Sequence, residues 1–189
     1  MKNYIGAKPF IFPQPVLLIG SYDAEGKPNL MNVAYGGIVN SNRLQINIGV
    51  RHKSSDNIKL TKEFTVGVAT EDILVAADYV GIVSGNDEPD KVEKSGLHVI
   101  KSEHINAPII EECMITMECV VEEINQYDQT LRIVAEIKDV LVDDAIALLD
   151  GHLDIGRAGI ISYDPDQHLY YKLGREVGRA FEDGKQLIG

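Results

Sequence analysis

The chain has 189 residues, of which 44% are hydrophobic and 25% charged, and its formal net charge is -11. This length and apolar fraction predict one folded domain with a substantial core, and the acidic charge argues against nucleic acid or an anionic lipid surface as a partner. No apolar run approaches the roughly 20 residues of a membrane helix. The start, interrupted by Pro9, Pro13 and Pro15, does not resemble a signal peptide. We therefore expect a cytoplasmic protein.

Cysteine and histidine spacing predicts neither a disulfide nor a metal site. Cys113 and Cys119 lie in a segment that reads as one strand, about 20 Å apart along it, which is too far for a disulfide. We interpret both as small buried hydrophobic residues. The five histidines are scattered, without the His-Glu-x-x-His or Cys-x-x-Cys spacing of zinc sites.

Apolar segments near the N-terminus predict a hairpin. Residues 15–22 read as a strand that ends at the turn-rich segment 23–28. Residues 29–41 read as a second strand with Gly36-Gly37 in its middle, which predicts a bulge or a close approach to the backbone. Two readings of the glycines stay open: a ligand that approaches them, or a barrel strand that bends there.

Residues 51–58, Arg-His-Lys-Ser-Ser-Asp-Asn-Ile, predict the start of a short helix. They follow residues 44–50, which alternate apolar and polar side chains like a half-buried strand. Ser54, Ser55 and Asp56 are good N-cap types, so we expect the helix to begin at about residue 55.

The same segment predicts a phosphate site. A helix N-terminus offers unpaired N–H groups and a partial positive charge to an anion. Arg51, His52 and Lys53 would add charged donors, and the hydroxyls of Ser54 and Ser55 can turn toward a phosphate oxygen. An ordinary capped surface helix fits these residues too, so the local pattern leaves both readings open.

The next segments predict a strand over residues 63–69 and an amphipathic helix over 71–83 with Thr70 as its N-cap. In the polar loop that follows, Lys91 stands among acidic residues. It is either a second phosphate donor or a solvated side chain, and local spacing does not decide between them.

The second half of the chain predicts a long antiparallel hairpin. Residues 113–125 and 130–143 read as its strands, because apolar and polar residues alternate along the second. Residues 143–149 are interpreted as a capped turn of helix. The tail, about residues 163–189, carries tyrosines and arginines and is interpreted as an arm that faces a partner.

Strands dominate, and short helices do not alternate regularly with them. This pattern predicts a mostly β protein with a closed or nearly closed antiparallel barrel, and residues 1–189 form one domain with a C-terminal arm. Neither Gly-x-Gly-x-x-Gly after a strand nor Gly-x-x-x-x-Gly-Lys-Ser/Thr occurs, so the standard nucleotide loops are excluded.

Taken in order, several motifs resemble the flavin reductase-like, flavoredoxin-type family of FMN-binding split-barrel proteins. They are Pro-Asn-Leu-Met-Asn-Val-Ala at 28–34, His-Lys-Ser-Ser-Asp-Asn-Ile at 52–58 with Glu-Phe-Thr-Val at 63–66, Ala-Asp-Tyr-Val-Gly-Ile-Val-Ser-Gly at 77–85, Asp-Lys at 90–91, Ser-Gly-Leu at 95–97, Met-Glu-Cys at 117–119 and Tyr-Lys-Leu-Gly at 171–174. Each motif is loose by itself, and their order and spacing carry the resemblance.

The resemblance implies an antiparallel Greek-key split β-barrel with two or three short helices, which forms a homodimer and holds one FMN per protomer near the interface. It also implies a flavin site made of phosphate donors and of a strand that lies along the flavin ring. The residues of this site are Asn29, Met31, Asn32, Val33, Ala34, Tyr35, Gly36, Arg51, His52, Lys53, Ser54, Ser55, Asn57, Ser84 and Lys91. It implies no protein acid or base, because the flavin supplies the redox chemistry.

Three functions are compatible with this resemblance. The first is a flavoredoxin-type oxidoreductase that passes electrons through a bound FMN, with NAD(P)H or a redox protein as candidate partners. The second is an NAD(P)H-dependent flavin reductase that releases reduced flavin to another protein, and the third is a non-catalytic FMN-binding module. Gly67, where many relatives have Asn, and Tyr35, where some have Trp, depart from the family pattern.

Overall fold

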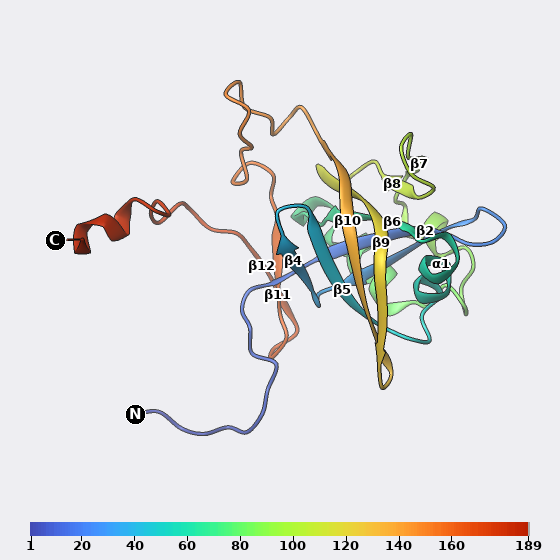
Figure 1. The fold of residues 1–189 in the computed structure, drawn as a ribbon, viewed down its shortest axis with the longest axis horizontal. Coiled ribbons are helices and arrows are strands. Elements are labelled where there is room, and N and C mark those ends of the chain that lie inside the picture. The colour runs from blue at the N-terminus through green and yellow to red at the C-terminus, as the bar shows by residue number, and fades with distance from the viewer. Residues whose placement is uncertain (189) are drawn as a thin grey trace.

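The computed structural model describes residues 1–188, and an antiparallel seven-stranded sheet dominates it (Figure 1). The strand order is β3-β2-β6-β9-β10-β5-β4. The strands are β2 (Leu17–Tyr22), β3 (Pro28–Val33), β4 (Gly36–Asn40), β5 (Arg43–Gly49), β6 (Glu63–Val68), β9 (Ile115–Tyr127) and β10 (Thr130–Val142). The sheet curls until β3 lies near β5, but these two strands share no hydrogen-bond ladder. The predicted antiparallel Greek-key barrel, split on one side, is confirmed.

Smaller elements surround the barrel. A second sheet consists of β1 (Gln14–Pro15), β11 (Ile161–Asp164) and β12 (Leu169–Lys172), and β7 (Val99–Lys101) pairs with β8 (Pro108–Ile110). The helices are α1 (Lys53–Thr61), α2 (Leu74–Ile82) and α3 (Lys91–Ser95), with 3-10 helices η1 (Glu71–Ile73) and η2 (Asp183–Leu187). The three α-helices of the described chain match the two or three that were predicted.

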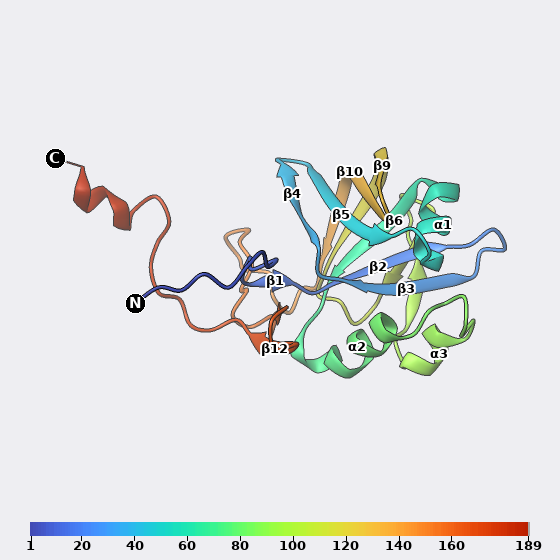
Figure 2. The ribbon, with the colours of Figure 1, turned by 90° about the horizontal axis from the view of Figure 1, so that it is seen from below.

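Strand β2 shows how the sequence builds two cores. Its residue Ile19 points into the barrel, where it packs with Phe64, Ile46 and other apolar residues. The preceding residue, Leu18, points to the opposite face, because side chains alternate along a strand. It belongs to a second cluster with Val80 of α2. Figure 2 shows α2 and α3 outside the sheet, next to β3. Burial of each such side chain contributes about 1.5–3 kcal/mol.

Helix α1 begins earlier than predicted. Its first residue is Lys53, and the N-cap is His52, whose side chain makes no capping hydrogen bond. The predicted start at about residue 55 is wrong, because Ser55 does not cap the helix. Its hydroxyl instead donates a 2.7 Å hydrogen bond to the carbonyl oxygen of Gly49, which fixes the turn between β5 and α1.

The predicted single strand over residues 29–41 is in fact two strands, β3 and β4, with a bend at Ala34 and Tyr35 between them. A Cβ atom on Gly36 would lie 2.9 Å from Cδ1 of Leu17, whereas one on Gly37 would meet nothing within 4 Å. The close approach at Gly36 is therefore made by a side chain of the protein itself.

Three further predictions need correction. Residues 143–149 form a turn, in which the Asp143 carboxylate accepts the N–H of Ala145 at 2.7 Å; no helix forms there. Thr70 makes no side-chain cap, and its helix opens with the 3-10 turn η1 before α2. The arm begins only after β12, because Tyr163 and Tyr170 belong to the second sheet.

The cysteine prediction is confirmed in part. Both cysteines are free and Cys119 is buried, whereas Cys113 is only half-buried and lies before β9, not within it. Burial raises the pKa of each thiol to about 12, with a smaller effect from a neighbouring glutamate. Both thiols are therefore protonated at neutral pH, as expected for small hydrophobic residues.

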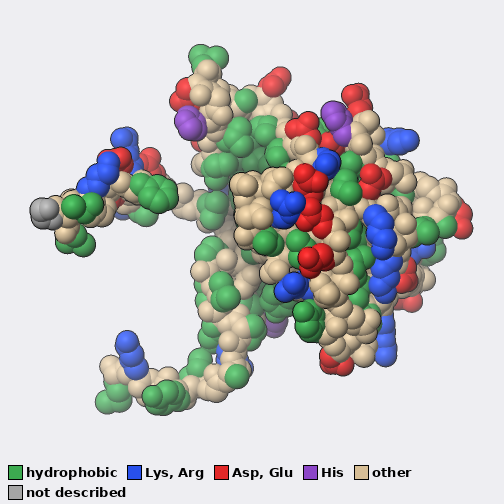
Figure 3. All heavy atoms as spheres, viewed as in Figure 1, with side chains coloured by type: hydrophobic (Ala, Val, Ile, Leu, Met, Phe, Trp, Pro, Cys, Tyr) green, Lys and Arg blue, Asp and Glu red, His purple; other side chains and the backbone are tan. Residues whose placement is uncertain are grey.

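Both ends of the chain extend from the same side of the barrel (Figures 1 and 2). Apolar side chains are exposed along them, among them Ile11, Val177 and Phe181, and Figure 3 shows apolar atoms gathered on these extensions.

Within residues 1–188, the chain has no helix with the length and apolarity needed to cross a membrane.

Candidate functional site

Three adjoining pockets lie where β3 passes the start of α1 and the end of α2. The first has a volume of about 60 Å³, the second about 310 Å³ and the third about 400 Å³. Met31 and His52 line both the first and the third, and Gly81 and Ile82 line both the first and the second. We call the first the small pocket, and the second and third together the groove.

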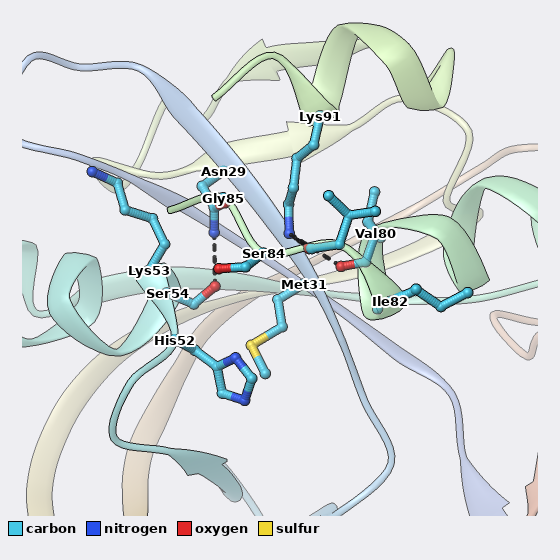
Figure 4. A pocket seen from close by; sticks show the side chains of 12 residues that line it. Asn29, Met31, His52, Lys53, Ser54, Val80, Ile82, Ser84, Gly85 and Lys91 are labelled. Atoms are coloured by element: carbon cyan, nitrogen blue, oxygen red, sulfur yellow. Dashed lines mark hydrogen bonds between the residues drawn. The ribbon is translucent and has the colours of Figure 1, made fainter. Parts of the chain in front are cut away.

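The small pocket combines groups that attract an anion (Figure 4). Lys53 and Ser54 belong to the first turn of α1, where backbone N–H groups have no partner within the helix. The His52 side chain does not cap this turn. The Ser55 N–H donates to the His52 carbonyl oxygen at 2.9 Å, so the N–H groups of Lys53 and Ser54 are the ones available to an acceptor in the pocket. The partial positive charge of the helix start acts in the same direction.

Lys91 is the most unusual member of the small pocket. Only 3% of its surface is exposed, and its ammonium group donates to the carbonyl oxygens of Val80 at 3.1 Å and Val83 at 2.8 Å, at the end of α2. Burial lowers its pKa to about 8. The solvated reading of Lys91 is thus wrong. An ammonium has three donors, so one remains after the two carbonyl contacts.

Asn29 holds the pocket's walls together. Its side-chain N–H donates a 2.8 Å hydrogen bond to the Ser54 hydroxyl and thereby joins β3 to α1. Its carboxamide oxygen lies only 2.2 Å from the position that a Cβ on Gly85 would occupy. Glycine at position 85 therefore lets the loop after α2 close over Asn29.

A neutral histidine separates the small pocket from the groove. Burial, and then the charge of Lys91, lowers the pKa of His52, so its imidazole is uncharged at neutral pH. The prediction that His52 adds a positive charge is therefore wrong. A Cβ on Gly49 would lie 3.1 Å from the His52 ring, so Gly49 leaves room for this ring orientation.

The groove runs along β3 and the bend that follows it. Its third-pocket portion is lined by residues 31–35 and by Asn47, Ile48, Gly49, His52, Thr130 and Tyr163. Volumes of about 300–1,000 Å³ are typical of sites for small organic ligands. The groove therefore suits a small organic group, and the small pocket beside it suits an anion.

Tyrosines of the second sheet form one wall of the groove. The Tyr170 hydroxyl donates a 2.8 Å hydrogen bond to Asp78 of α2, and burial together with this carboxylate raises its pKa. Tyr163 packs against Tyr170 with ring centroids 5.7 Å apart, and its hydroxyl is 2.6 Å from the His168 ring. The wall thus depends on contacts between α2 and β11–β12.

The structure brings most of the predicted site residues together. The small pocket gathers Asn29, Met31, His52, Lys53, Ser54, Ser84 and Lys91, and the groove gathers Met31, Asn32, Val33, Ala34 and Tyr35.

Four predicted residues line neither the small pocket nor the groove. Ser55 and Asn57 are buried, and the Asn57 amide donates to Ser21 at 3.2 Å. Gly36 packs against Leu17. Arg51 is exposed and lines an adjoining depression, which shares Gly49 and His52 with the groove.

Sequence reasoning missed several lining residues. Asn47, Asp78, Gly81, Ile82, Thr130, Tyr163, His168 and Tyr170 line the pockets without having been predicted there. The tyrosines gave a signal as an aromatic cluster in the tail, and Asp78, Gly81 and Ile82 lie in the motif at 77–85. Asn47 and Thr130 reach the groove through pairing of distant strands, with Thr130 of β10 opposite Gly49 of β5.

The fold is thus a split barrel in which a small pocket with anion-attracting groups adjoins a larger groove. The family model described as "Flavin reductase like domain" matches residues 10–156. The chain therefore belongs to the flavin reductase-like family.

Individual relatives agree with this assignment. The solved structure of a flavoredoxin of Desulfovibrio vulgaris (Miyazaki F) is 30% identical and superposes with a TM-score of 0.93 over 98% of this chain and 100% of that one. A flavoredoxin from Methanosarcina acetivorans is also 30% identical, with a TM-score of 0.89 and 99% of both chains covered. An uncharacterized protein from Archaeoglobus fulgidus is 32% identical over 77% of this chain and 81% of its own length.

Proposed function

We propose that this protein is an FMN-binding oxidoreductase of the flavoredoxin type, which transfers electrons through an FMN that stays bound. The observation that carries the proposal is the buried ammonium of Lys91 in a pocket that also receives the start of α1. Two backbone carbonyl oxygens compensate this buried cation in part, and its third N–H donor is left for an anion in the pocket. The groove that adjoins this pocket supplies space for a flavin ring.

The small pocket would hold the FMN phosphate. The N–H groups of Lys53 and Ser54, the Ser54 hydroxyl and the remaining donor of Lys91 are the groups placed to bind it. A pocket of about 60 Å³ suits one phosphate, and the chain lacks the glycine-rich loops that bind a pyrophosphate. Both points favour FMN over FAD.

The groove would hold the ring system. Strand β3 is an edge strand of the large sheet, so backbone N–H and C=O groups on its unpaired side would be the polar groups that contact the ring. In the bend that follows, the Tyr35 carbonyl oxygen already accepts the Asn47 N–H at 2.8 Å. Bound FMN would supply acceptance and donation of a hydride or of single electrons, and the protein would supply orientation and electrostatics. We assign no residue as a general acid or base.

We further propose that the protein is a homodimer. Strand β4 lies at the edge of the large sheet, and its residues Ile38 and Val39 are 67% and 50% exposed. The extended terminal segments expose further apolar residues, including Ile11 and Phe181. Exposed apolar edges of this kind are covered in stable assemblies. Light scattering at micromolar concentration should give the mass of two chains, and the mass of one chain would contradict the proposal.

One experiment distinguishes the candidate functions. We expect the purified protein to retain stoichiometric FMN through gel filtration and to release FMN on denaturation. Anaerobic stopped-flow measurements with reduced nicotinamide or a reduced redox protein should then show reduction of the bound flavin, at a rate that excess free FMN does not change.

Two other outcomes would support the alternatives. Sequential kinetics with free FMN as a consumed substrate would favour a flavin reductase that releases its flavin. Retention of FMN without reduction by any donor would favour a non-catalytic binding module. Stoichiometric FAD in place of FMN would contradict the assignment of the small pocket to a single phosphate.

A further inference from the structure

A second cluster of polar side chains lies apart from the pocket and groove. It consists of His104 in the loop between β7 and β8, Glu118 in β9 and Asp139 in β10. One ligand atom from each residue lies within 4.8 Å of the others. None of the three lines the small pocket or the groove, so the flavin site does not account for the cluster.

Glu118 is the buried member of this cluster, with 1% of its surface exposed. Its Oε1 atom accepts a 2.5 Å hydrogen bond from the Ser102 hydroxyl, but Oε2 has no hydrogen-bond partner within residues 1–188. No lysine or arginine in that part of the chain forms an ion pair with it. A buried carboxylate with a free oxygen is costly without a compensating cation.

A register shift puts a second carboxylate directly opposite Glu118. In the β9–β10 ladder Ile137 pairs with Cys119 and Asp139 pairs with Glu118, so Lys138 is the extra residue of a bulge. Directly opposed residues of an antiparallel pair point to the same face, and like charges there are destabilising. Bulges are features that re-aim side chains. A cation between the two carboxylates would remove the repulsion.

Ser102 fixes the histidine loop beside this pair. Its hydroxyl oxygen accepts the backbone N–H groups of His104 at 3.0 Å and Ile105 at 2.9 Å, while the same hydroxyl donates to Glu118. The loop and the carboxylate are therefore held by one residue. The His104 ring is exposed and makes no hydrogen bond within the described chain.

We propose that His104, Glu118 and Asp139 bind a divalent first-row transition-metal ion, of which Zn²⁺ is the best fit. One imidazole and two carboxylates are suited to such ions, whereas Mg²⁺ and Ca²⁺ prefer sites built only from oxygen. Bonds to Zn²⁺ are about 2.0–2.2 Å long. Ligand atoms now within 4.8 Å of one another reach that geometry by small side-chain adjustments, with water completing the coordination.

The ion would act as a structural clip. It would tie the loop between β7 and β8 to the central strands β9 and β10, which that loop otherwise reaches through the hydrogen bond from Ser102 to Glu118. Anything that binds only the folded state raises its stability by mass action. Zn²⁺ should therefore raise the melting temperature without changing the flavin content.

The test uses the full-length, tag-free protein with its native flavin content, freed of metal by a chelator. Calorimetric titration with Zn²⁺ should give one site per chain, and Co²⁺ should give visible absorption bands from the same site. Ca²⁺ and Mg²⁺ should not raise the melting temperature. Because the cluster does not line the flavin site, these results are independent of whether the proposed electron transfer is right.

Variants locate the site. His104→Ala, at an exposed position that does not threaten folding, should weaken Zn²⁺ binding more than Ser102→Ala. Ser102→Ala should lower the affinity for Zn²⁺ by about 10- to 100-fold, as expected for a residue that orients a ligand. Glu118→Gln keeps the shape of the side chain and should abolish stoichiometric binding.

A matched control comes from His98, an exposed histidine 2.6 Å from Glu112 that lies outside the cluster. His98→Ala should bind Zn²⁺ like the wild type. The proposal is overturned if the wild type binds no stoichiometric Zn²⁺, or if His104→Ala binds it as tightly as the wild type. Either result would show that this cluster does not hold the ion.

Discussion

The ammonium group of Lys91 lies 2.8 Å from the carbonyl oxygen of Val83, just past the C-terminus of α2. The C-terminal end of a helix carries a partial negative charge that stabilises a cation. The contact therefore lets a lysine stay protonated in a position where almost none of its surface is exposed. Lys91 also lines the small pocket. One residue therefore donates to the carbonyl groups at the end of α2 and contributes a positive charge to the candidate anion site.

Replacing Lys91 with methionine should weaken FMN binding by about 10- to 100-fold. A hydrogen bond between charged groups contributes about 1.5–3 kcal/mol, and each 1.4 kcal/mol is a factor of ten in affinity. Fluorescence titration of the flavin-free protein measures the change. Lys94→Ala is the control, because Lys94 pairs with Glu88 at the surface. Equal losses in the two variants would contradict the assignment.

FMN affinity should also fall as the pH rises above about 8. Burial lowers the pKa of Lys91 to about 8, so the ligand-free protein loses this positive charge above that pH and must take up a proton to bind the phosphate. The decline should approach tenfold per pH unit between about 8.5 and 9.5. Lys91→Met should show no such decline, and an identical pH profile in both proteins would rule out Lys91 as the group responsible.

The two serines of α1 should behave differently. Ser54→Ala removes a hydroxyl that lines the small pocket and should weaken FMN binding by about 10- to 100-fold. Ser55→Ala removes the donor to the Gly49 carbonyl and should lower the free energy of unfolding by about 1–3 kcal/mol, with a smaller effect on affinity. Urea unfolding and flavin titration of both variants separate the effects. A larger loss of affinity in Ser55→Ala would contradict this division.

The sequence predicted the barrel because its signals are local. The alternation in β5 and β10 and the turn-rich segment between β2 and β3 specify strands and hairpins from neighbouring residues alone. The phosphate segment was also recognisable, since basic and hydroxyl residues follow a strand. Local patterns do not reveal which hydroxyl points to a ligand. Ser55 fits the pattern as well as Ser54, but its hydroxyl donates to the Gly49 carbonyl oxygen at the end of β5.

Long-range contacts were not accessible in the same way. Thr130 enters the groove because β10 pairs with β5, and Tyr163 enters it because β11 pairs with β1. Neither pairing has a local sequence signal. The proposed metal site was not predicted from the sequence for the same reason, since His104, Glu118 and Asp139 come from three separate segments and lack a recognisable spacing. A strand bulge, visible only in the paired ladder, puts two of them opposite each other.

Gly67, a departure from the family pattern, has a packing reason. A Cβ at this position would lie 2.6 Å from the sulfur of Cys113, so Gly67→Ala should lower the free energy of unfolding by about 1–3 kcal/mol through overpacking. The double variant Gly67→Ala/Cys113→Ala should recover part of that loss, because contacting residues are energetically coupled. Denaturant unfolding of the wild type, both single variants and the double variant tests this. Strictly additive losses would contradict the contact.

Gly85→Ala should disrupt the small pocket on the side formed by the loop after α2. Its Cβ would collide with the Asn29 carboxamide oxygen, which lies 2.2 Å from the ideal position, and would break the Asn29–Ser54 hydrogen bond or push the loop outward. Either movement separates the Ser54 hydroxyl from the Lys91 ammonium, so we expect FMN to be lost on gel filtration.

Gly37→Ala is the matched control for this prediction, because a Cβ there meets nothing within 4 Å. It should retain FMN and keep the wild-type melting temperature within the small range of surface substitutions. Absorbance at the flavin band before and after gel filtration measures retention in both variants, and circular dichroism confirms that each is folded. Gly85→Ala protein that is folded and fully loaded with FMN would show that the phosphate does not depend on the geometry of this pocket.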